Sequence, residues 1–202
     1  MTGGEIFAAI EQYAQAYARL EAIQRSKEQI MSLGDQKTGV IAEYFAMLYA
    51  KNRFPQSPAT FYTGAWDIRV EHDSERSTLI QVKAVSDFSG TSRISPIKAK
   101  KEAEESFWDE LLLMRLSKKF LPVGFWIIRK NDVTWSGRTL THRTMPRRGQ
   151  PDSGSAEFRT AEDCLPKLWD VLRAAYLKLP ELAVALASYE SEIAVITARE
   201  KL

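Results

Sequence analysis

The chain has 202 residues, of which 45% are hydrophobic and 27% charged, and this composition is ordinary for one soluble globular domain with helical extensions. Its formal net charge of +2 is too small to indicate a nucleic-acid partner by itself. It contains no apolar run of about 18 residues and no basic start followed by an apolar stretch, so we expect a cytoplasmic protein with no membrane contact. One cysteine, Cys164, and two histidines, His72 and His142, exclude an intrachain disulfide, a cysteine zinc cluster and a histidine metal site, so any bound metal should have oxygen ligands.

Two helices are predicted in the first quarter of the chain. Apolar side chains recur at helical spacing over residues 5–33, and Gly34 is a suitable residue to end this long amphipathic helix. Asp35 can cap a second helix over about residues 36–51. The apolar positions of the first helix include Ile6, Ile10, Tyr13, Tyr17 and Leu20.

Glu43, in the second predicted helix, has no cation among its helix neighbours. The residues three and four positions away are Gly39, Val40, Ala46 and Met47. An ionised Glu43 that faces inward therefore needs a partner from elsewhere, and a metal ion or a metal-bound water would supply one. The alternative is that Glu43 faces solvent between two packed stripes of the helix.

Residues 64–85 predict a β-hairpin, because two runs rich in β-branched residues flank a charged break. If the hairpin is symmetric about Ser74, Asp67 lies opposite Gln81. Lys83 then shares the face of Gln81, since side chains alternate along a strand. A carboxylate, an amide and an ammonium group would converge on one face of the sheet.

This group of side chains suits metal-assisted chemistry on phosphate. Carboxylate and amide oxygens are the hard ligands that Mg²⁺ prefers, and Mg²⁺ takes few protein ligands and keeps several waters. A lysine beside the ion can orient a water and offset the charge that builds on phosphorus. The alternative is that Asp67 and Lys83 form an ordinary cross-strand ion pair on a solvated face.

The middle of the chain predicts a loop, a helix and a strand. Residues 86–96 are rich in Ser, Gly and Thr, as in exposed loops that contact substrates. Residues 97–119 are assigned to a helix, and residues 121–128 to a strand buried on both faces. The predicted helix would direct Phe107, Leu111, Leu112, Met114 and Leu116 toward the core.

The last third predicts a strand pair at a sheet edge over residues 132–144 and a flexible segment over residues 145–155. Thr160 can cap a helix that runs to about Lys178, and a last helix is expected over residues 180–202. The helices from the two ends of the chain could pack on each other or on a second subunit.

Arginines concentrate between residues 133 and 151, where no acidic residue occurs. If this segment lies beside the hairpin, its guanidinium groups would match phosphate geometry. The alternative is a solvated loop. With one arginine from the preceding loop, the candidate DNA-binding residues are Arg93, Arg138, Arg143, Arg147 and Arg148.

The arrangement of Asp67, a spacer and Gln81-Val82-Lys83 resembles the active-site signature of the PD-(D/E)XK nucleases, in the variant where Gln replaces the second acid. Mrr-type restriction enzymes and some transposon-end endonucleases resemble it in this respect. The helix preceding the hairpin fits the family's Gly-x-x-x-Glu pattern from Gly39 to Glu43, and the likeness covers roughly residues 35–128. Trp66 stands where the family often has Pro, and we expect its indole in the core.

The resemblance implies a restriction-endonuclease-like core, in which helices flank a mixed central sheet. It also implies a Mg²⁺-dependent DNA endonuclease that leaves a 5′-phosphate, with Mn²⁺ expected to substitute for Mg²⁺. Catalysis would depend on Asp67, Gln81, Lys83 and Glu43, and the metal ligands would be Asp67, Gln81 and Glu43. Because Gln81 carries no charge, Mg²⁺ attraction is weakened unless Glu43 restores it.

The expected organisation is one nuclease-like domain over residues 1–202, with an N-terminal helix over 1–34, an α/β core over 35–150 and C-terminal helices over 160–202. Cutting both DNA strands would require two sites, hence a homodimer or a partner subunit. Two other readings remain open. One is a catalytically inactive nucleic-acid-binding or assembly module with the same fold, and the other is a structural protein that acts through its terminal helices.

Overall fold

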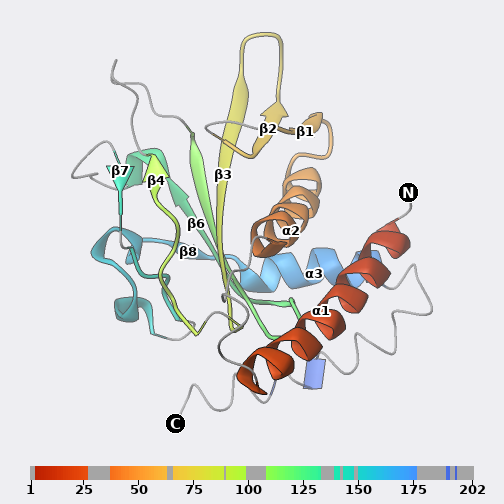
Figure 1. Ribbon diagram of the computed structural model, residues 1–202. Helices are drawn as coiled ribbons and strands as arrows, with labels where there is room; N and C mark the ends of the chain where they lie inside the picture. Colours follow the sequence, from red (N-terminus) through yellow and green to blue (C-terminus); the bar gives the residue numbers. More distant parts are fainter. Residues whose placement is uncertain are drawn as a thin grey trace.

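One six-stranded mixed sheet forms the centre of the fold (Figure 1). Its strands, in spatial order, are β1 (Ala59–Phe61), β2 (Ile68–Glu71), β3 (Ser77–Ser86), β5 (Glu110–Leu116), β6 (Pro122–Arg129) and β8 (Glu162–Asp163). β3 and β5 are parallel, and the other neighbouring strands are antiparallel. The structure is a computed structural model that describes residues 3–26, 37–62, 66–88, 90–98, 108–132, 139–141, 143–147, 150–176, 190, 191 and 194.

Three helices of the described chain lie on one face of this sheet: α1 (Gly3–Ser26), α2 (Lys37–Arg53) and α3 (Leu165–Tyr176) (Figure 1). Their apolar side chains and those of the facing strands form one core, which includes Phe7 from α1, Phe45 from α2 and Leu168 from α3. The burial of these side chains supplies the main favourable term that fixes the helices on the sheet. Among the described residues, no helix is both long and apolar enough to cross a bilayer.

In the described part of the chain, short segments and no long helix cover the other face of the sheet. β4 (Ile97–Lys98) pairs with β7 (Thr139–Leu140). Three 3-10 turns lie before and after β7 in the sequence: η1 (Lys130–Asp132), η2 (Pro151–Ser153) and η3 (Ala156–Phe158). The second core on this face is made of Val85, Ile94, Ile97, Trp108, Leu111, Leu113, Trp126, Ile128, Met145 and Phe158.

Alternation along the strands explains why the chain forms two cores. In β5, Leu112 and Met114 belong to the core under the helices, whereas Leu111 and Leu113 belong to the second core. Successive side chains of a strand point to opposite faces, so a continuous apolar run fills both sides. β6 follows the same rule, as predicted for residues 121–128.

The predicted helix over residues 97–119 is wrong wherever the structure describes it. Residues 97 and 98 form β4, and residues 110–116 form β5, while residues 99–107 lie outside the described part of the chain. The run Leu111-Leu112-Leu113-Met114 is apolar at every position, so its periodicity fits a buried helix and a buried strand equally well. Pairing with β3 and β6 decides in favour of the strand.

The C-terminal third also differs from expectation. The described part of residues 132–144 contributes β7, which pairs with β4 and not with the edge of the central sheet. The segment over residues 145–155 is anchored where it is described, since Met145 is fully buried and its N–H donates to the Ser92 carbonyl at 2.8 Å.

The helix expected from Thr160 begins at Leu165 instead. Residues 162 and 163 form β8 on the edge of β6, and the Leu165 N–H donates to the Asp163 carboxylate at 3.0 Å. Asp163 therefore takes the capping role that the sequence suggested for Thr160. Of the last predicted helix, only residues 190, 191 and 194 are described, and they are helical. The predicted cap at Asp35 and residues 27–34 lie outside the described residues.

Candidate active site

Asp67 lies directly before β2, and its backbone is held from two sides. Its N–H donates to the Ile80 carbonyl of β3 at 2.8 Å, and its own carbonyl accepts the Tyr62 N–H beyond β1 at 2.9 Å. The Oδ2 atom of its carboxylate accepts the Val82 N–H at 2.6 Å and the side-chain amide of Gln81. Both the backbone and one carboxylate oxygen of Asp67 are thus fixed by neighbouring strands.

The hairpin of β2 and β3 has the predicted register. Ile68 faces Ile80 and Glu71 faces Ser77, which places the centre of symmetry at Ser74. Continuing this register brings Asp67 next to Gln81, as the hydrogen bond between their side chains requires. Gln81 is buried and Lys83 is half-buried.

Glu43 approaches the same group from α2. It is half-buried, and a Cβ atom at Gly39, one turn earlier, would lie 3.8 Å from Glu43 Oε1, so the carboxylate folds back over Gly39. Glu43 makes no hydrogen bond or ion pair within the described part of the chain. It interacts electrostatically with Asp67, which repels it, and with Lys83, which attracts it.

Burial dominates the electrostatics of these groups. It raises the pKa of Glu43 to about 7, with a further increase from Asp67 that Lys83 partly opposes. Burial also raises the pKa of Asp67, although the Val82 N–H, Lys83 and Gln81 each act to lower it. Burial lowers the pKa of Lys83, although Asp67 and Glu43 act to raise it. Although Asp67 and Lys83 attract each other, desolvation outweighs that attraction for both.

The donor set fits a divalent cation with oxygen ligands. Asp67 Oδ1 accepts no hydrogen bond from the described residues, and Glu43 has two carboxylate oxygens without such a partner. A cation bound by these carboxylates would offset the burial that raises both of their pKa values and the repulsion by Asp67 that raises the pKa of Glu43 further. The described residues contain no cluster of three or more His, Cys, Asp or Glu, so Mg²⁺ would keep several waters here.

Gln81 needs a local change to join such a set. Its amide nitrogen, not its oxygen, faces Asp67. A half-turn about its last torsion angle would exchange the two atoms and bring Oε1 against Asp67 Oδ2. Two oxygens at that separation repel each other unless a cation lies between them.

The candidate DNA-binding arginines have different environments. Arg93 and Arg147 are exposed, whereas Arg143 is bound to Glu157 at 2.6 Å and retains a side-chain exposure of 25%. The chain around Arg93 runs beside Thr144, so the loop and the arginine segment are neighbours. Because Glu157 neutralises Arg143, the exposed pair is better suited to meet phosphate. Arg138 and Arg148 lie outside the described residues.

Trp66 is not in the core. It is half-buried, and its ring stacks on the exposed ring of Tyr62 with 4.7 Å between centroids and 15° between planes. The sequence analysis did not single out Tyr62. The signal that could have drawn attention to it is the spacing of two aromatic residues, since Tyr62 and Trp66 stand shortly before Asp67 in the sequence.

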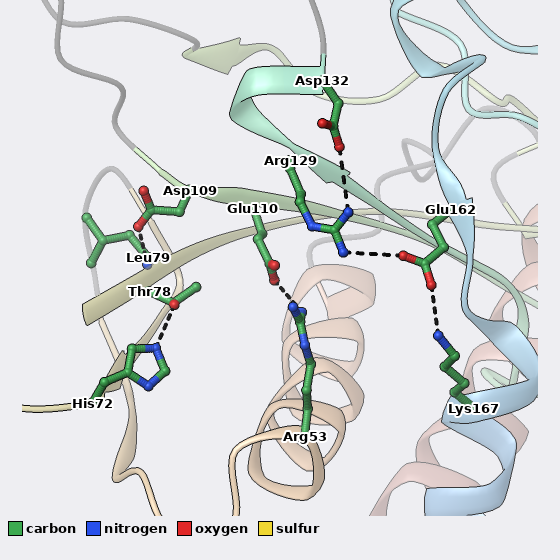
Figure 2. Close-up of polar contacts among 10 residues, drawn as sticks. All are labelled: Arg53, His72, Thr78, Leu79, Asp109, Glu110, Arg129, Asp132, Glu162 and Lys167. Carbon is green, nitrogen blue, oxygen red and sulfur yellow. Dashed lines mark hydrogen bonds and ion pairs between the residues drawn. The ribbon is translucent and has the colours of Figure 1, made fainter. Parts of the chain in front are cut away.

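A second set of charges ties the strands to the helices and turns around them (Figure 2). Glu110, a buried acid at the start of β5, accepts a hydrogen bond from Arg53 of α2 at 2.7 Å. The Asp109 carboxylate accepts the Leu79 N–H of β3 at 2.9 Å. These contacts satisfy buried polar groups, so we assign them to stability and not to the candidate site.

Two comparisons with known proteins found no match: no family model matches the chain, and neither does any curated protein. Five solved chains do match. One is the bacterial homing endonuclease I-Ssp6803I, which is 14% identical with a TM-score of 0.38 over 77% of this chain and 99% of that one. A TM-score of this size does not establish a common fold, so the proposals below depend on the residues themselves.

Proposed function

We propose that this protein is a Mg²⁺-dependent DNA endonuclease with a restriction-endonuclease-like core, and that Mn²⁺ can replace Mg²⁺. The observation that supports the proposal is a set of interactions among four side chains. Asp67 binds Gln81 directly, Asp67 and Lys83 shift each other's pKa values, and both shift the pKa of Glu43. Half-buried acids and a half-buried lysine that interact electrostatically are typical of functional sites.

Each residue has a distinct role in this proposal. Asp67 holds the cation through its carboxylate, Gln81 through its amide oxygen, and Glu43 directly or through a water. The bound cation would polarise a phosphoryl oxygen and lower the pKa of the attacking water. Lys83 directs its ammonium group at the phosphate, offsets the negative charge of the transition state and helps to position the water. In-line attack on phosphorus then leaves a 5′-phosphate, as the resemblance to the PD-(D/E)XK nucleases implies.

The test is cleavage of supercoiled plasmid by the full chain in MgCl₂, in MnCl₂ and in EDTA. We expect cleavage that depends on the metal and that falls by about 100-fold or more in Asp67→Ala and in Lys83→Ala, as when other enzymes lose one transition-state contact. Asp152→Ala and Lys118→Ala are matched controls, because both residues are exposed; they should cut like the wild type. Far-UV circular dichroism verifies that every variant is folded.

Two outcomes would contradict the proposal: a wild-type protein that cuts with neither metal, or cleavage that survives both site substitutions. Calorimetric titration with Mg²⁺, with and without DNA, provides an independent readout. Labelling the products with a polynucleotide kinase, before and after phosphatase treatment, shows which end carries the phosphate. A 5′-phosphate blocks the labelling before phosphatase treatment and permits it afterwards.

One observation favours a second candidate, an inactive nucleic-acid-binding or assembly module. The Gln81 amide already donates to Asp67, so part of the site is satisfied by hydrogen bonding without a cation. In that case DNA binding would persist in Asp67→Ala, and no metal would support cleavage.

A further inference from the structure

Tyr62 presents an aromatic ring to solvent beside the candidate site. Its side chain is 51% exposed, and within the described residues only Phe61 is a comparably exposed large apolar side chain. Tyr62 follows β1, which is the edge strand of the sheet (Figure 1). An aromatic ring that is exposed beside a candidate site is accessible to a ligand and offers it a flat apolar surface.

The ring of Tyr62 is held in place from behind. Trp66 covers one of its faces in a nearly parallel stack, and the half-buried position of Trp66 limits the motion of the pair. The indole N–H of Trp66 is buried and donates to no described atom, so its ring is fixed by stacking and not by a hydrogen bond. The exposed part of Tyr62 is accessible to a planar ligand.

The backbone connects this platform to Asp67. In the register of β1 and β2, Phe61 faces Ile68, and the next step along the register pairs Tyr62 with Asp67. The Tyr62 N–H donates to the Asp67 carbonyl at 2.9 Å. Tyr62 is therefore the backbone neighbour of Asp67 across the two strands, which places the stacked pair at the margin of the candidate site.

We propose that Tyr62 stacks on an unpaired base next to the phosphodiester that is cleaved, an inference that rests on the nuclease function proposed above. A base inside a duplex has both faces covered by its neighbours, so only an unpaired base can offer a face to a protein ring. The preferred substrate is therefore a nucleic-acid strand with unpaired nucleotides at the cleavage point. Stacking of this kind tolerates any base, so it selects strand structure and not sequence.

The experiment measures binding without cleavage, in EDTA. A short DNA strand that carries 2-aminopurine, whose fluorescence is quenched by stacking, is titrated with the full chain, and the same strand in a blunt duplex is titrated in parallel. We expect Tyr62→Ala to bind the single strand about 5- to 100-fold more weakly and to lose the quenching, with duplex affinity unchanged. Tyr62→Phe keeps the ring and should behave like the wild type, since the Tyr62 hydroxyl has no partner among the described residues.

Equal single-strand affinity and quenching in Tyr62→Ala and wild type would overturn the inference. The inference would also be overturned if Tyr62→Ala changed the oligomeric state, measured by size-exclusion chromatography, and left DNA binding unchanged. The ring would then belong to a protein interface. Loss of binding to the single strand in Tyr62→Phe would equally overturn it. If the platform binds as expected but no substrate is cut in Mg²⁺ or Mn²⁺, the nuclease proposal fails and the stacking site stands.

Discussion

Glu43 is half-titrated near neutral pH, which makes its protonation a property that can be measured in the metal-free protein. Its pKa of about 7 in the folded chain lies above the ordinary value of 4.5. A carboxyl group whose pKa is raised by folding contributes stability below its unfolded pKa and loses it as the pH rises through the folded value. The metal-free protein should therefore lose stability between about pH 4.5 and pH 7.

Glu43→Gln should remove this dependence. At about pH 3.5 the wild-type side chain is neutral in both the folded and the unfolded chain, so the variant and the wild type should have equal free energies of unfolding. At pH 8 the variant should be more stable by on the order of 1 kcal/mol, a value reduced from the full pKa shift because Glu43 is half-exposed to solvent. Urea unfolding in EDTA at both pH values measures the difference. Equal stabilities at pH 8 would contradict the burial of the Glu43 charge.

Added Mg²⁺ provides the matching control. Since a proton and Mg²⁺ would compete for Glu43, Mg²⁺ at pH 8 should stabilise the wild type more than Glu43→Gln.

Gly39 sets the space available to the Glu43 carboxylate. The position of a Cβ atom at Gly39 is 3.8 Å from Glu43 Oε1, an ordinary contact distance. Gly39→Ala should therefore stabilise α2 by about 0.4–1 kcal/mol without moving Glu43, because Ala restricts the unfolded chain. Gly39→Leu fills the space and should reduce cleavage. Thermal unfolding measures the stability of both variants, and plasmid assays measure their cleavage, each compared with the wild type. A loss of cleavage in Gly39→Ala would contradict the expectation that a methyl group fits beside the Glu43 carboxylate.

Three residues of the candidate site could be singled out from local spacing in the sequence, and Glu43 from its lack of a cation among its helix neighbours and from the Gly-x-x-x-Glu pattern. Asp67 and Gln81 come together through the symmetry of one short hairpin, and Lys83 follows from strand alternation. The stack of Tyr62 on Trp66 could not be predicted in this way. It depends on how β1 docks on β2, and spacing within one strand does not contain that information.

At the scale of elements, the sequence predicted helices and strands wherever local pattern and tertiary packing agree. α2 was predicted as a helix, and its buried apolar side chains belong to the core. β6 was predicted as a strand buried on both faces, and all of its residues except Arg129 are buried. β5 was assigned to a helix because its apolar run has no period of its own. Its identity comes from two partners distant in sequence, β3 and β6, and no local propensity encodes such pairing.

Arg53 and Glu110 join α2 to β5, and their pairing is a testable element contact (Figure 2). The Glu110 side chain is 8% exposed, so Arg53→Ala would leave a buried carboxylate without its cation. We expect a loss of about 1–3 kcal/mol, below the value for a fully buried pair because Arg53 is partly exposed. Chemical denaturation measures it. Arg53→Met combined with Glu110→Gln should recover most of the stability, and a double variant as unstable as Arg53→Ala would argue against a charge effect.

At the scale of the whole molecule, one chain offers one candidate site, since Glu43, Asp67, Gln81 and Lys83 form a single group. In the proposed nuclease function, one site would cut one strand per encounter, so double-strand breaks would require a second copy or a partner subunit. Plasmid assays should show open circles first, and linear DNA should rise more steeply with protein concentration than open circles do. Agarose gels over a concentration series test this. Linear DNA that forms before open circles at every concentration would mean a preformed pair of sites.

The edge position of β1 ties the candidate site to the least protected part of the sheet. β1 has only three residues, and the residue that follows it holds the Asp67 carbonyl. Short edge strands open at a lower free energy than the paired centre of a sheet. Warming should therefore break the bond from Tyr62 to the Asp67 carbonyl and loosen Asp67 on that side while β3, β5 and β6 remain paired, and cleavage should fade at temperatures where far-UV circular dichroism still reports a folded chain. The upper working temperature of this protein would then be set by three residues at its margin and not by its melting point.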